Sequence, residues 1–437
     1  MWIVTTALLT DHYELTMLRG ARQAGTADRR CVFELFARRL PDGRRYGVVA
    51  GVDRALDAIE QFTFDQPDID YLAEHQVVDD ETLGWLADYR FTGDVWGYPE
   101  GEMYFPGSPV LVVEGSFAEC VLLETVLLSI YNHDSAIASA ASRMTGAAGD
   151  RPCIEMGSRR THEQSAVAAA RAAYVAGFQA TSNLEAGRRH GVPTTGTAAH
   201  AFTLLHDTER DAFAAQLAAL GEDTTLLVDT YDVEQAVRLG VELTEGRLGA
   251  VRLDSGDLGA LAAEVREQLD SLGAERTRII VTSDLDEWQI AALASAPVDG
   301  YGVGTSLVTG SGHPTCGFVY KLVSRATSTG PDAALLPVAK KSKDKTSIGG
   351  RKLALRRLTG GVAEAEIIAI DRPVEGDHDD RDLLVRLVVG GEVVGREQLA
   401  AARERHARSR AELPMDAMKL SRGEPVIKTS YLEARDA

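Results

Sequence analysis

The chain has no lysine before Lys321, and every fixed positive side-chain charge up to that point is an arginine. An aldolase that works through a Schiff base needs a lysine at the end of a barrel strand. None of the strand-like segments described below carries one. Schiff-base chemistry is therefore excluded from the part of the chain that resembles a barrel.

Cysteine is also scarce. The four cysteines are widely separated, at Cys31, Cys120, Cys153 and Cys316. No two of them form a CxxC pair, which is the spacing that many zinc and redox sites use. We expect reduced thiols in a cytoplasmic protein, with neither a disulfide framework nor a zinc site.

Long apolar runs are absent as well. No uncharged run approaches the length of a membrane span, and the N-terminal MWIVTTALLTDHYE has too short an apolar run, and no basic region, for a signal peptide. The formal net charge is −19. An acidic surface repels phosphate, so we expect neither nucleic acid nor a membrane surface as a partner.

The motifs of several enzyme classes are missing too. The chain has neither the GxSxG of serine hydrolases nor the HExxH of zinc proteases. The stretch GSRRTHEQSAVAAA, which starts at Gly157, lacks the glycine spacing of a dinucleotide-binding turn. Hydrolases of these kinds and dinucleotide oxidoreductases are therefore disfavoured.

What the middle of the chain does contain is a repeated pattern. Short apolar segments end in Gly, Ser, Thr, Asp or Arg, mostly at steps of about 25 residues, as a strand plus a returning helix requires. Seven segments fit: CIEMGSRR from Cys153, GFQATSN from Gly177, VPTTGTAAH from Val192, TLLVDTYD from Thr225, GAVRLDSGD from Gly249, RIIVTSD from Arg278 and GYGVGTS from Gly300. They predict an irregular seven-stranded α/β barrel related to the (β/α)₈ type, with a doubly wound open sheet as the alternative.

The two ends of the chain differ from this middle part. Residues 1–120 mix strand-like stretches such as CVFELFARRL with loops, and residues 326–437 add short strands, a basic loop and a charged helix. We expect one flanking α+β domain built from both ends, around a barrel formed by residues 121–325. The helix-like ETVLLSIYNHDSAIASAASRM leads into that barrel, and DLGALAAEVREQLDSLG has the apolar spacing of a helix that ends at a glycine.

Polar residues gather where the predicted strands end, the edge at which α/β folds carry their chemistry. Arginines bind anionic groups through two hydrogen bonds, a Gly-Thr turn offers free N–H groups to phosphate, and an aspartate accepts hydrogen bonds from sugar hydroxyls. The residues concerned are Gly157, Arg159, Arg160, Arg252, Asp254, Ser255, Gly256, Asp257, Gly302, Gly304 and Thr305. Together they indicate a phosphorylated sugar and a second anionic ligand.

One histidine stands among small residues, in the stretch TTGTAAHAF that contains His200. The next strand ends in VDTYD, where Asp229 could accept a hydrogen bond from one imidazole nitrogen and leave the other facing the site. A histidine that caps a helix locally is the other interpretation, and the residues alone leave it open.

Taken in order, the motifs resemble those of nicotinate phosphoribosyltransferases. LLTDHYELTM, IEMGSRR, TTGTAAH, VRLDSGDL, GYGVGTSL, YKLV and PVAKKSKDKTSIGGRK occur in the family's order, from Thr10 to about Gly423. The resemblance implies a type II phosphoribosyltransferase-like α/β barrel with a flanking domain. It also implies the family's reaction: nicotinate and phosphoribosyl pyrophosphate (PRPP) give nicotinate mononucleotide and pyrophosphate, which feeds NAD salvage, with ATP hydrolysis coupled through a phosphohistidine.

The resemblance implies roles for particular residues. His200 resembles the phosphorylated histidine and Asp229 its orienting partner. Arg252 resembles the arginine beside nicotinate and the phosphoribosyl group, and Asp254 the acceptor of ribose hydroxyls. The phosphate turn corresponds to Gly302, Gly304 and Thr305, and further substrate contacts to Gly157, Arg159, Ser255 and Gly256.

Several further expectations follow from the resemblance. Tyr13 resembles an aromatic residue that stacks on the pyridine ring across a homodimer interface, so each active site would need two subunits. The lysine-rich loop from Lys340 to Lys352 would lie near a triphosphate or pyrophosphate, and Mg²⁺ is the expected helper, with ligands that the sequence does not identify. The small molecules expected as partners are nicotinate, PRPP and ATP.

The chain departs from the family at one point, since Met156 stands where a phenylalanine is usual. Related nicotinamide-using enzymes place an aspartate near the pyridine substituent, whereas QATSN here offers neutral Ser182 and Asn183. This favours nicotinate. The alternatives are a nicotinamide or quinolinate phosphoribosyltransferase, a lyase or isomerase barrel acting on a sugar phosphate, and a non-catalytic metabolite-binding relative.

Overall fold

The computed structural model describes residues 5–340, 347–374, 376–377 and 379–432. The chain forms two compact units. Residues 1–136 and 315–437 make the first, and residues 137–314 make the second. The first unit therefore combines both ends of the chain, and the sequence placed the two divisions near residues 120 and 325.

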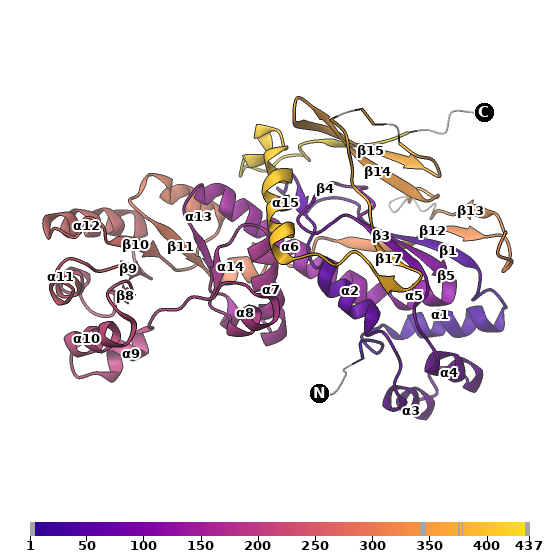
Figure 1. Cartoon of the computed structure of the whole chain (residues 1–437), viewed down its shortest axis with the longest axis horizontal. Helices are drawn as coiled ribbons and strands as arrows, with labels where there is room; N and C mark the ends of the chain where they lie inside the picture. The colour runs from indigo at the N-terminus through magenta and orange to yellow at the C-terminus, as the bar shows by residue number, and fades with distance from the viewer. Residues whose placement is uncertain (1–4, 341–346, 375, 378, 433–437) are drawn as a thin grey trace. The chain divides into compact units, whose positions relative to one another are not determined.

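The second unit is built on a parallel sheet of six strands, in the order β7-β6-β11-β10-β9-β8. Strands β8, β9, β10 and β11 are labelled in Figure 1. Each neighbouring pair is parallel. The strands are β6 (Cys153–Glu155), β7 (Ala180–Thr181), β8 (Thr225–Leu227), β9 (Ala250–Leu253), β10 (Arg278–Val281) and β11 (Gly300–Val303). Parallel strands need covering layers on their faces, which is why these segments are so apolar.

Six of the seven predicted segments form strands, and the segment from Val192 does not. It makes one isolated bridge, between Thr181 and Thr194. Thr181 N–H donates to Pro193 O at 2.9 Å, and Thr195 N–H donates to Thr181 O at 3.0 Å. Proline cannot donate to a ladder, and β7 offers only two residues to pair with. The sheet is therefore a curled parallel sheet of six strands with an irregular seventh segment at its β7 edge, rather than the expected seven-stranded barrel.

Helices return the chain between these strands. They are α7 (Glu163–Val175), α8 (Leu184–His190), α9 (His200–Leu205), α10 (Glu209–Leu220), α11 (Val233–Leu243), α12 (Leu258–Ser271), α13 (Glu287–Ala292) and α14 (Thr305–Val308), with short 3₁₀ turns at Ser158–Arg160 and Leu293–Ser295. The helix predicted from DLGALAAEVREQLDSLG is confirmed as α12. The Asp257 side chain caps its start by accepting from Ala260 N–H at 3.2 Å, and Ala262, Val265 and Leu269 are its buried positions.

Among its described residues, the first unit contains three sheets, in the orders β13-β12-β1-β5-β3-β17-β18, β16-β14-β15-β19 and β2-β4. Their strands are β1 (Arg30–Ala37), β2 (Gly47–Val48), β3 (Asp94–Gly97), β4 (Met103–Tyr104), β5 (Leu111–Ser116), β12 (Phe318–Ala326), β13 (Leu335–Pro337), β14 (Lys352–Thr359), β15 (Val362–Ile370), β16 (Arg381–Asp382), β17 (Val385–Val389), β18 (Glu392–Val393) and β19 (Lys428–Tyr431). The strand predicted from CVFELFARRL is confirmed as β1. It pairs with β5 on one side and with β12, from the other end of the chain, on the other.

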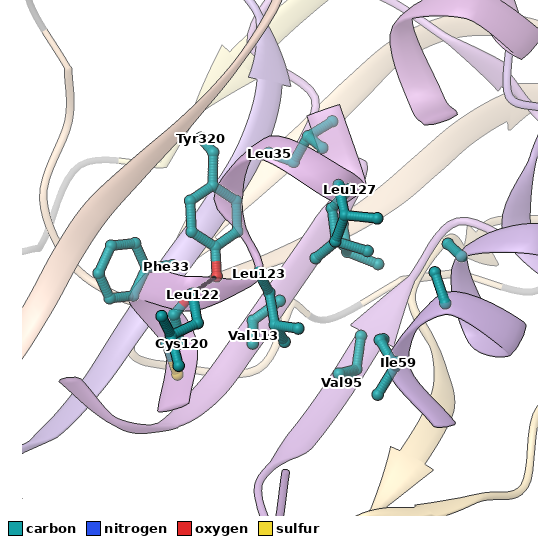
Figure 2. Packing of buried hydrophobic residues seen from close by; sticks show 14 of the residues in the cluster. Phe33, Leu35, Ile59, Val95, Val113, Cys120, Leu122, Leu123, Leu127 and Tyr320 are labelled. Carbon is teal, nitrogen blue, oxygen red and sulfur yellow. Dashed lines mark hydrogen bonds between the residues drawn. The ribbon is translucent and has the colours of Figure 1, made fainter. Parts of the chain in front are cut away.

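The helices of this unit are α1 (His12–Gln23), α2 (Val52–Glu60), α3 (Gln66–Glu74), α4 (Asp80–Ala87), α5 (Phe117–Leu122) and α15 (Leu399–Ala411), with a 3₁₀ turn at Met415–Met418; α6 (Glu124–Ala148) begins here and runs into the second unit. Figure 2 shows part of the core that they cover. Phe33 of β1 stacks on Tyr320 of β12 with ring centroids 4.9 Å apart, and the buried Tyr320 hydroxyl donates to Cys120 O at 2.9 Å. Contacts between both chain ends thus hold this core together.

A buried lysine in this unit corrects one expectation. Lys352 is 2% exposed, and its Nζ donates to Glu34 Oε2 at 2.5 Å and to Ile348 O at 2.8 Å. A side chain so enclosed cannot also reach a phosphate, so Lys352 is a structural residue. Residues 341–346 of the same loop lie outside the described residues.

Within the residues that the structure describes, no helix has both the length and the apolar character needed to cross a membrane.

Candidate functional site

The carboxyl ends of the parallel strands meet at one edge of the six-stranded sheet, and a cavity of about 250 Å³ opens there. Its walls come from the turns after β6, β9, β10 and β11. The lining residues are Met156, Arg159, Arg160, Arg252, Asp254, Thr282, Ser283, Asp284, Gly302, Gly304 and Thr305. Three arginines and two aspartates in one small cavity favour a ligand that carries both anionic groups and hydroxyls.

The turns after β6 and β11 form one side of this cavity. Met156 N–H donates to Val303 O at 2.8 Å, which holds the two turns together. A side chain at Gly302 would crowd its neighbours, because a Cβ there would lie 2.5 Å from Thr282 Cγ2 and 2.7 Å from Met156 Sδ. The Met156 side chain therefore fills the space that a larger residue at 302 would take.

Arg252, on β9, is held at the cavity by a residue of the irregular seventh segment. Its Nη1 donates to Thr197 Oγ1 at 2.6 Å, and its Nε is buried without a hydrogen-bond partner. Burial lowers the pKa of the Arg252 guanidinium, while the charges of Asp254 and Asp229 oppose that shift. The unpaired nitrogen leaves Arg252 with hydrogen-bonding capacity for an anionic ligand.

His200 begins α9, and its ring lies between polar residues of the turns that follow β8 and β9. Nδ1 is 3.1 Å from Thr230 Oγ1, whereas Nε2 is 3.9 Å from Asp229 Oδ1 and 4.0 Å from Asp254 Oδ2. The expected hydrogen bond from His200 to Asp229 is therefore not formed, and Thr230 makes the direct contact. The His200 side chain is 41% exposed, so Nε2 has room for a group to approach it.

Asp229 instead organises the turn after β9. Its Oδ2 accepts from Asp254 N–H at 3.0 Å and from Ser255 Oγ at 2.7 Å. Its Oδ1 is buried and has no hydrogen-bond partner. Asp254 in turn accepts from the Thr282 hydroxyl, which fixes its carboxylate at the cavity.

The structure brings most of the predicted site residues to this edge. Eight line the cavity: Met156, Arg159, Arg160, Arg252, Asp254, Gly302, Gly304 and Thr305. Six others lie in the adjoining turns of the same sheet: Gly157, Ser182, His200, Asp229, Ser255 and Gly256.

Tyr13 lies in the other unit, on α1, and is 44% exposed. Partial burial and the nearby carboxylate of Glu124 raise the pKa of its phenol to about 12. The phenol is therefore protonated at neutral pH and can donate a hydrogen bond.

Sequence reasoning missed four residues that hold the site in place. Thr197 holds Arg252, Thr230 contacts His200, Thr282 donates to Asp254, and Glu155 is a buried carboxylate at the end of β6. All four belong to the segments singled out above. The available signal was their position at a strand end, but a threonine hydroxyl or a lone glutamate there is too common to be selected without coordinates.

Comparisons with known proteins show the family to which the chain belongs. Residues 8–132 match the model of the nicotinate phosphoribosyltransferase (NAPRTase) N-terminal domain. The nicotinate phosphoribosyltransferase pncB1 of Mycobacterium tuberculosis is 57% identical over 437 residues, covering 98% of this chain and 95% of that protein. The chain belongs to the nicotinate phosphoribosyltransferase family.

Two human comparisons extend the family assignment to the fold. The human nicotinate phosphoribosyltransferase sequence is 32% identical over 420 residues, with 80% of this chain and 77% of that protein covered. The crystal structure of human nicotinic acid phosphoribosyltransferase matches with a TM-score of 0.82 at 26% identity, over 96% of this chain and 97% of that one. The coarser part of the expected fold class, a parallel α/β sheet with a further domain, is therefore confirmed, whereas the seven-stranded barrel is not.

Proposed function

We propose that this nicotinate phosphoribosyltransferase joins nicotinate to PRPP at the carboxyl edge of its six-stranded sheet. The products are nicotinate mononucleotide and pyrophosphate, and the first of these feeds NAD synthesis. The observation that carries the proposal is the cavity itself, which combines Arg159, Arg160 and Arg252 with the carboxylate of Asp254. The arginines suit phosphate and carboxylate groups, and Asp254 suits ribose hydroxyls.

The reaction displaces pyrophosphate from C1 of the ribose by the pyridine nitrogen. The carbon–oxygen bond to pyrophosphate breaks as the carbon–nitrogen bond forms, through a state in which positive charge builds up on the sugar. The protein must hold the nitrogen in line and neutralise the leaving group. Asp254, fixed by Thr282, would hold the ribose hydroxyls, and Arg252, fixed by Thr197, would contact nicotinate and the phosphoribosyl group.

His200 is the proposed site of phosphorylation by ATP. If Nδ1–H donates to Thr230 Oγ1, the lone pair of Nε2 is free to attack the γ-phosphorus, with ADP as the leaving group. Phosphorylation changes the charge and hydrogen bonding beside the substrate cavity. ATP can drive the cycle only through such a difference in affinity between two states of the enzyme.

The surroundings of Nε2 also explain why a cation is expected. The carboxylates of Asp229 and Asp254 lie 3.9 and 4.0 Å from Nε2 and would repel a phosphoryl group. The described residues contain no cluster of three or more His, Cys, Asp or Glu that would bind a metal by themselves. Mg²⁺ is commonly bound by one or two carboxylates plus the phosphates of a substrate, and Asp254 with the unpaired Oδ1 of Asp229 fits that pattern.

The small residues before His200 leave space for such a group. Thr194–Gly196 and Ala199 are exposed, and a Cβ added to Gly196 would have no heavy atom within 4 Å. Packing within this chain therefore does not explain why these residues are small. Room for a phosphoryl group would explain it.

The turn after β7 favours nicotinate as the pyridine substrate. Ser182 is exposed there, and the Asn183 side chain is occupied by Ser158 and Ala186. Both residues are neutral, whereas an aspartate would repel the nicotinate carboxylate. A nicotinamide or quinolinate phosphoribosyltransferase is the alternative within the class.

We also propose a homodimer in which the exposed Tyr13 of one subunit stacks on the pyridine bound to the other.

The test is to incubate the protein with γ-labelled ATP and quench at alkaline pH, where phosphohistidine survives. Formation of nicotinate mononucleotide from PRPP is followed in parallel, with nicotinate, nicotinamide and quinolinate compared. His200→Ala is the variant, and His206→Ala, whose Nδ1 lies 2.8 Å from Phe202 O at the other end of α9, is the matched control.

We expect label and product from the wild type and from His206→Ala, and no label from His200→Ala. Product without label would remove ATP coupling through His200. The absence of product with all three pyridines would overturn the proposed reaction and point to the sugar-phosphate alternative.

A further inference from the structure

Glu155, the last residue of β6, has no part in the function proposed so far. Its side chain is 0% exposed, and it lies directly before the cavity residue Met156. One carboxylate oxygen accepts from Gly157 N–H, and the other accepts from the Thr181 hydroxyl at the end of β7. A single carboxylate therefore bridges the turns that follow two neighbouring strands.

Further hydrogen bonds close this bridge into a ring. Thr181 Oγ1 also accepts from Asn183 N–H at 2.9 Å, and Asn183 Nδ2 donates to Ser158 Oγ at 3.0 Å. Ser158 lies one residue beyond Gly157, so the ring returns to the turn in which it began. The ladder between β6 and β7 ends where Ser182 N–H donates to Glu155 O at 2.9 Å. Beyond that point, these side-chain bonds link the two turns.

The turn after β6 leaves little freedom for movement. A Cβ added to Gly157 would collide with Val308 Cγ1 and would lie 2.9 Å from Gly304 O and 3.1 Å from Glu155 Oε1. The turn thus packs closely against the Gly304–Thr305 turn, which forms the same side of the cavity. A shift of Gly157 would move both Arg159 and the glycine turn that faces it.

We propose that the Glu155–Thr181 bridge is a positioning device that sets the distance between the pyridine-facing turn after β7 and the arginine-bearing turn after β6. The inference rests on the function proposed above, since it assigns these turns to substrate binding. Neither Glu155 nor Thr181 lines the cavity. Glu155 acts through Met156 and Arg159, which do line it, and Thr181 acts through the turn that holds Ser182.

The chemistry of the bridge explains why a carboxylate stands here. Two donors, one amide and one hydroxyl, converge on a buried site, and a carboxylate accepts from both through separate oxygens. An apolar residue would leave the Gly157 N–H buried and unpaired. Burial raises the pKa of the Glu155 carboxyl, and the bonds from Thr181 and Gly157 oppose that shift.

The closing experiment compares two buried threonines of the same sheet. Thr181→Val removes the hydroxyl of the bridge and keeps the side-chain shape, whereas Thr181→Ser keeps the hydroxyl. The matched control is Thr277→Val. Thr277 is 1% exposed next to β10 at the amino edge of the sheet, and its hydroxyl donates to Leu248 O at 2.8 Å. Steady-state kinetics with nicotinate and amide hydrogen exchange in peptides 153–163 and 178–186 are the two measurements.

For Thr181→Val, we expect KM for nicotinate to rise at least tenfold with a smaller change in kcat, and exchange in both peptides to become at least tenfold faster. Thr181→Ser should remain within about threefold of the wild type. Thr277→Val should lose stability without a change in KM. A wild-type KM in folded Thr181→Val, or an equal rise in Thr277→Val, would overturn the inference.

If Thr181→Val does not fold, Ser158→Ala takes its place, because it removes only the hydroxyl that accepts from Asn183 Nδ2. A raised KM in that variant supports the inference, and an unchanged KM overturns it. The exchange measurement does not depend on turnover. A wild type without product would therefore overturn the proposed function, while unchanged exchange in Thr181→Val would overturn the bridge.

Discussion

Nε2 of His200 lies 3.9 Å from Oδ1 of Asp229, an oxygen that is buried and has no hydrogen-bond partner. The distance is too long for a hydrogen bond, although the Asp229 side chain is only 4% exposed. A buried carboxylate oxygen without a partner is costly, so this arrangement is suited to a state in which a cation or a protonated ring occupies the gap.

Asp229→Asn should reduce labelling of His200 by ATP at least tenfold while leaving the fold intact. The amide oxygen can keep the bonds from Asp254 N–H and Ser255, which turns the amide NH₂ toward Nε2, where it would donate to the attacking lone pair. Alkaline-quenched labelling measures the effect. Asp232→Asn is the control, because Asp232 caps α11 nearby and asparagine caps equally well. Full labelling of Asp229→Asn would contradict this account of Nε2.

Arg252→Lys should lower kcat/KM for nicotinate by about 100-fold, which corresponds to the loss of two hydrogen bonds of about 1.4 kcal/mol each. A lysine presents one ammonium group and cannot bond Thr197 and a ligand in the same fixed plane. Arg266→Lys, on the outer helix α12, is the matched control and should leave kcat/KM unchanged. A loss below threefold in Arg252→Lys would show that a point charge is sufficient there.

Gly302→Ala should destabilise the enzyme by about 1–3 kcal/mol and reduce its affinity for PRPP, because the added Cβ meets Thr282 and Met156 at the cavity wall. Thermal denaturation and PRPP titration measure the two effects. Gly20→Ala, in α1, has no neighbouring atom within 4 Å of the new Cβ and should be neutral or stabilising. Wild-type stability in Gly302→Ala would mean that the wall can move to accept a methyl group.

The folding stability of the wild type should fall between about pH 5 and pH 8 through Glu14. Burial raises the pKa of this carboxyl from 4.5 to about 8, although Thr125 donates two hydrogen bonds to it. The folded state therefore keeps a proton that the unfolded chain loses at lower pH, so raising the pH through this range favours unfolding. Urea denaturation at pH 5 and pH 8 measures the free energy of unfolding. Its decrease between these two pH values should be smaller by about 3 kcal/mol in Glu14→Gln than in the wild type. Equal drops in both proteins would exclude Glu14 as the source.

Lys352→Met should destabilise the fold by about 3–5 kcal/mol, because it leaves Glu34 buried without its partner. The double variant Lys352→Met, Glu34→Leu should recover most of that stability and should retain activity. A stable but inactive double variant would instead return Lys352 to the phosphate-binding role that the sequence suggested.

The sequence was informative where a property repeats along the chain. Apolar segments at regular steps predicted six of the strands, because burial on both faces of a parallel sheet requires such runs. The seventh segment, from Val192, looked the same in composition. It does not form a strand because Pro193 lacks an N–H to donate and because its neighbour β7 is only two residues long. The length of β7 is known only from the structure.

The candidate site, like the fold, was predicted from the sequence only in part. Charged and glycine residues at the strand ends could be named because few of them are needed for packing. The roles of Thr197, Thr230 and Thr282 could not be predicted from the sequence, because each depends on one hydroxyl group that contacts one partner. Lys352 was misassigned for the opposite reason: its charge looked exposed, and its partner Glu34 is far away in the sequence.

The pairing of β1 with β12 has a consequence for how the protein is made. On the ribosome, β1 emerges early, but its neighbour β12 follows only after the whole second unit has been synthesised. At about 5–20 residues per second, that edge of β1 waits for tens of seconds, with an apolar strand exposed to solvent. The inserted unit, whose sheet is made of consecutive segments, can fold during this delay. Newly made chains should therefore depend on chaperones for the first unit more than for the second.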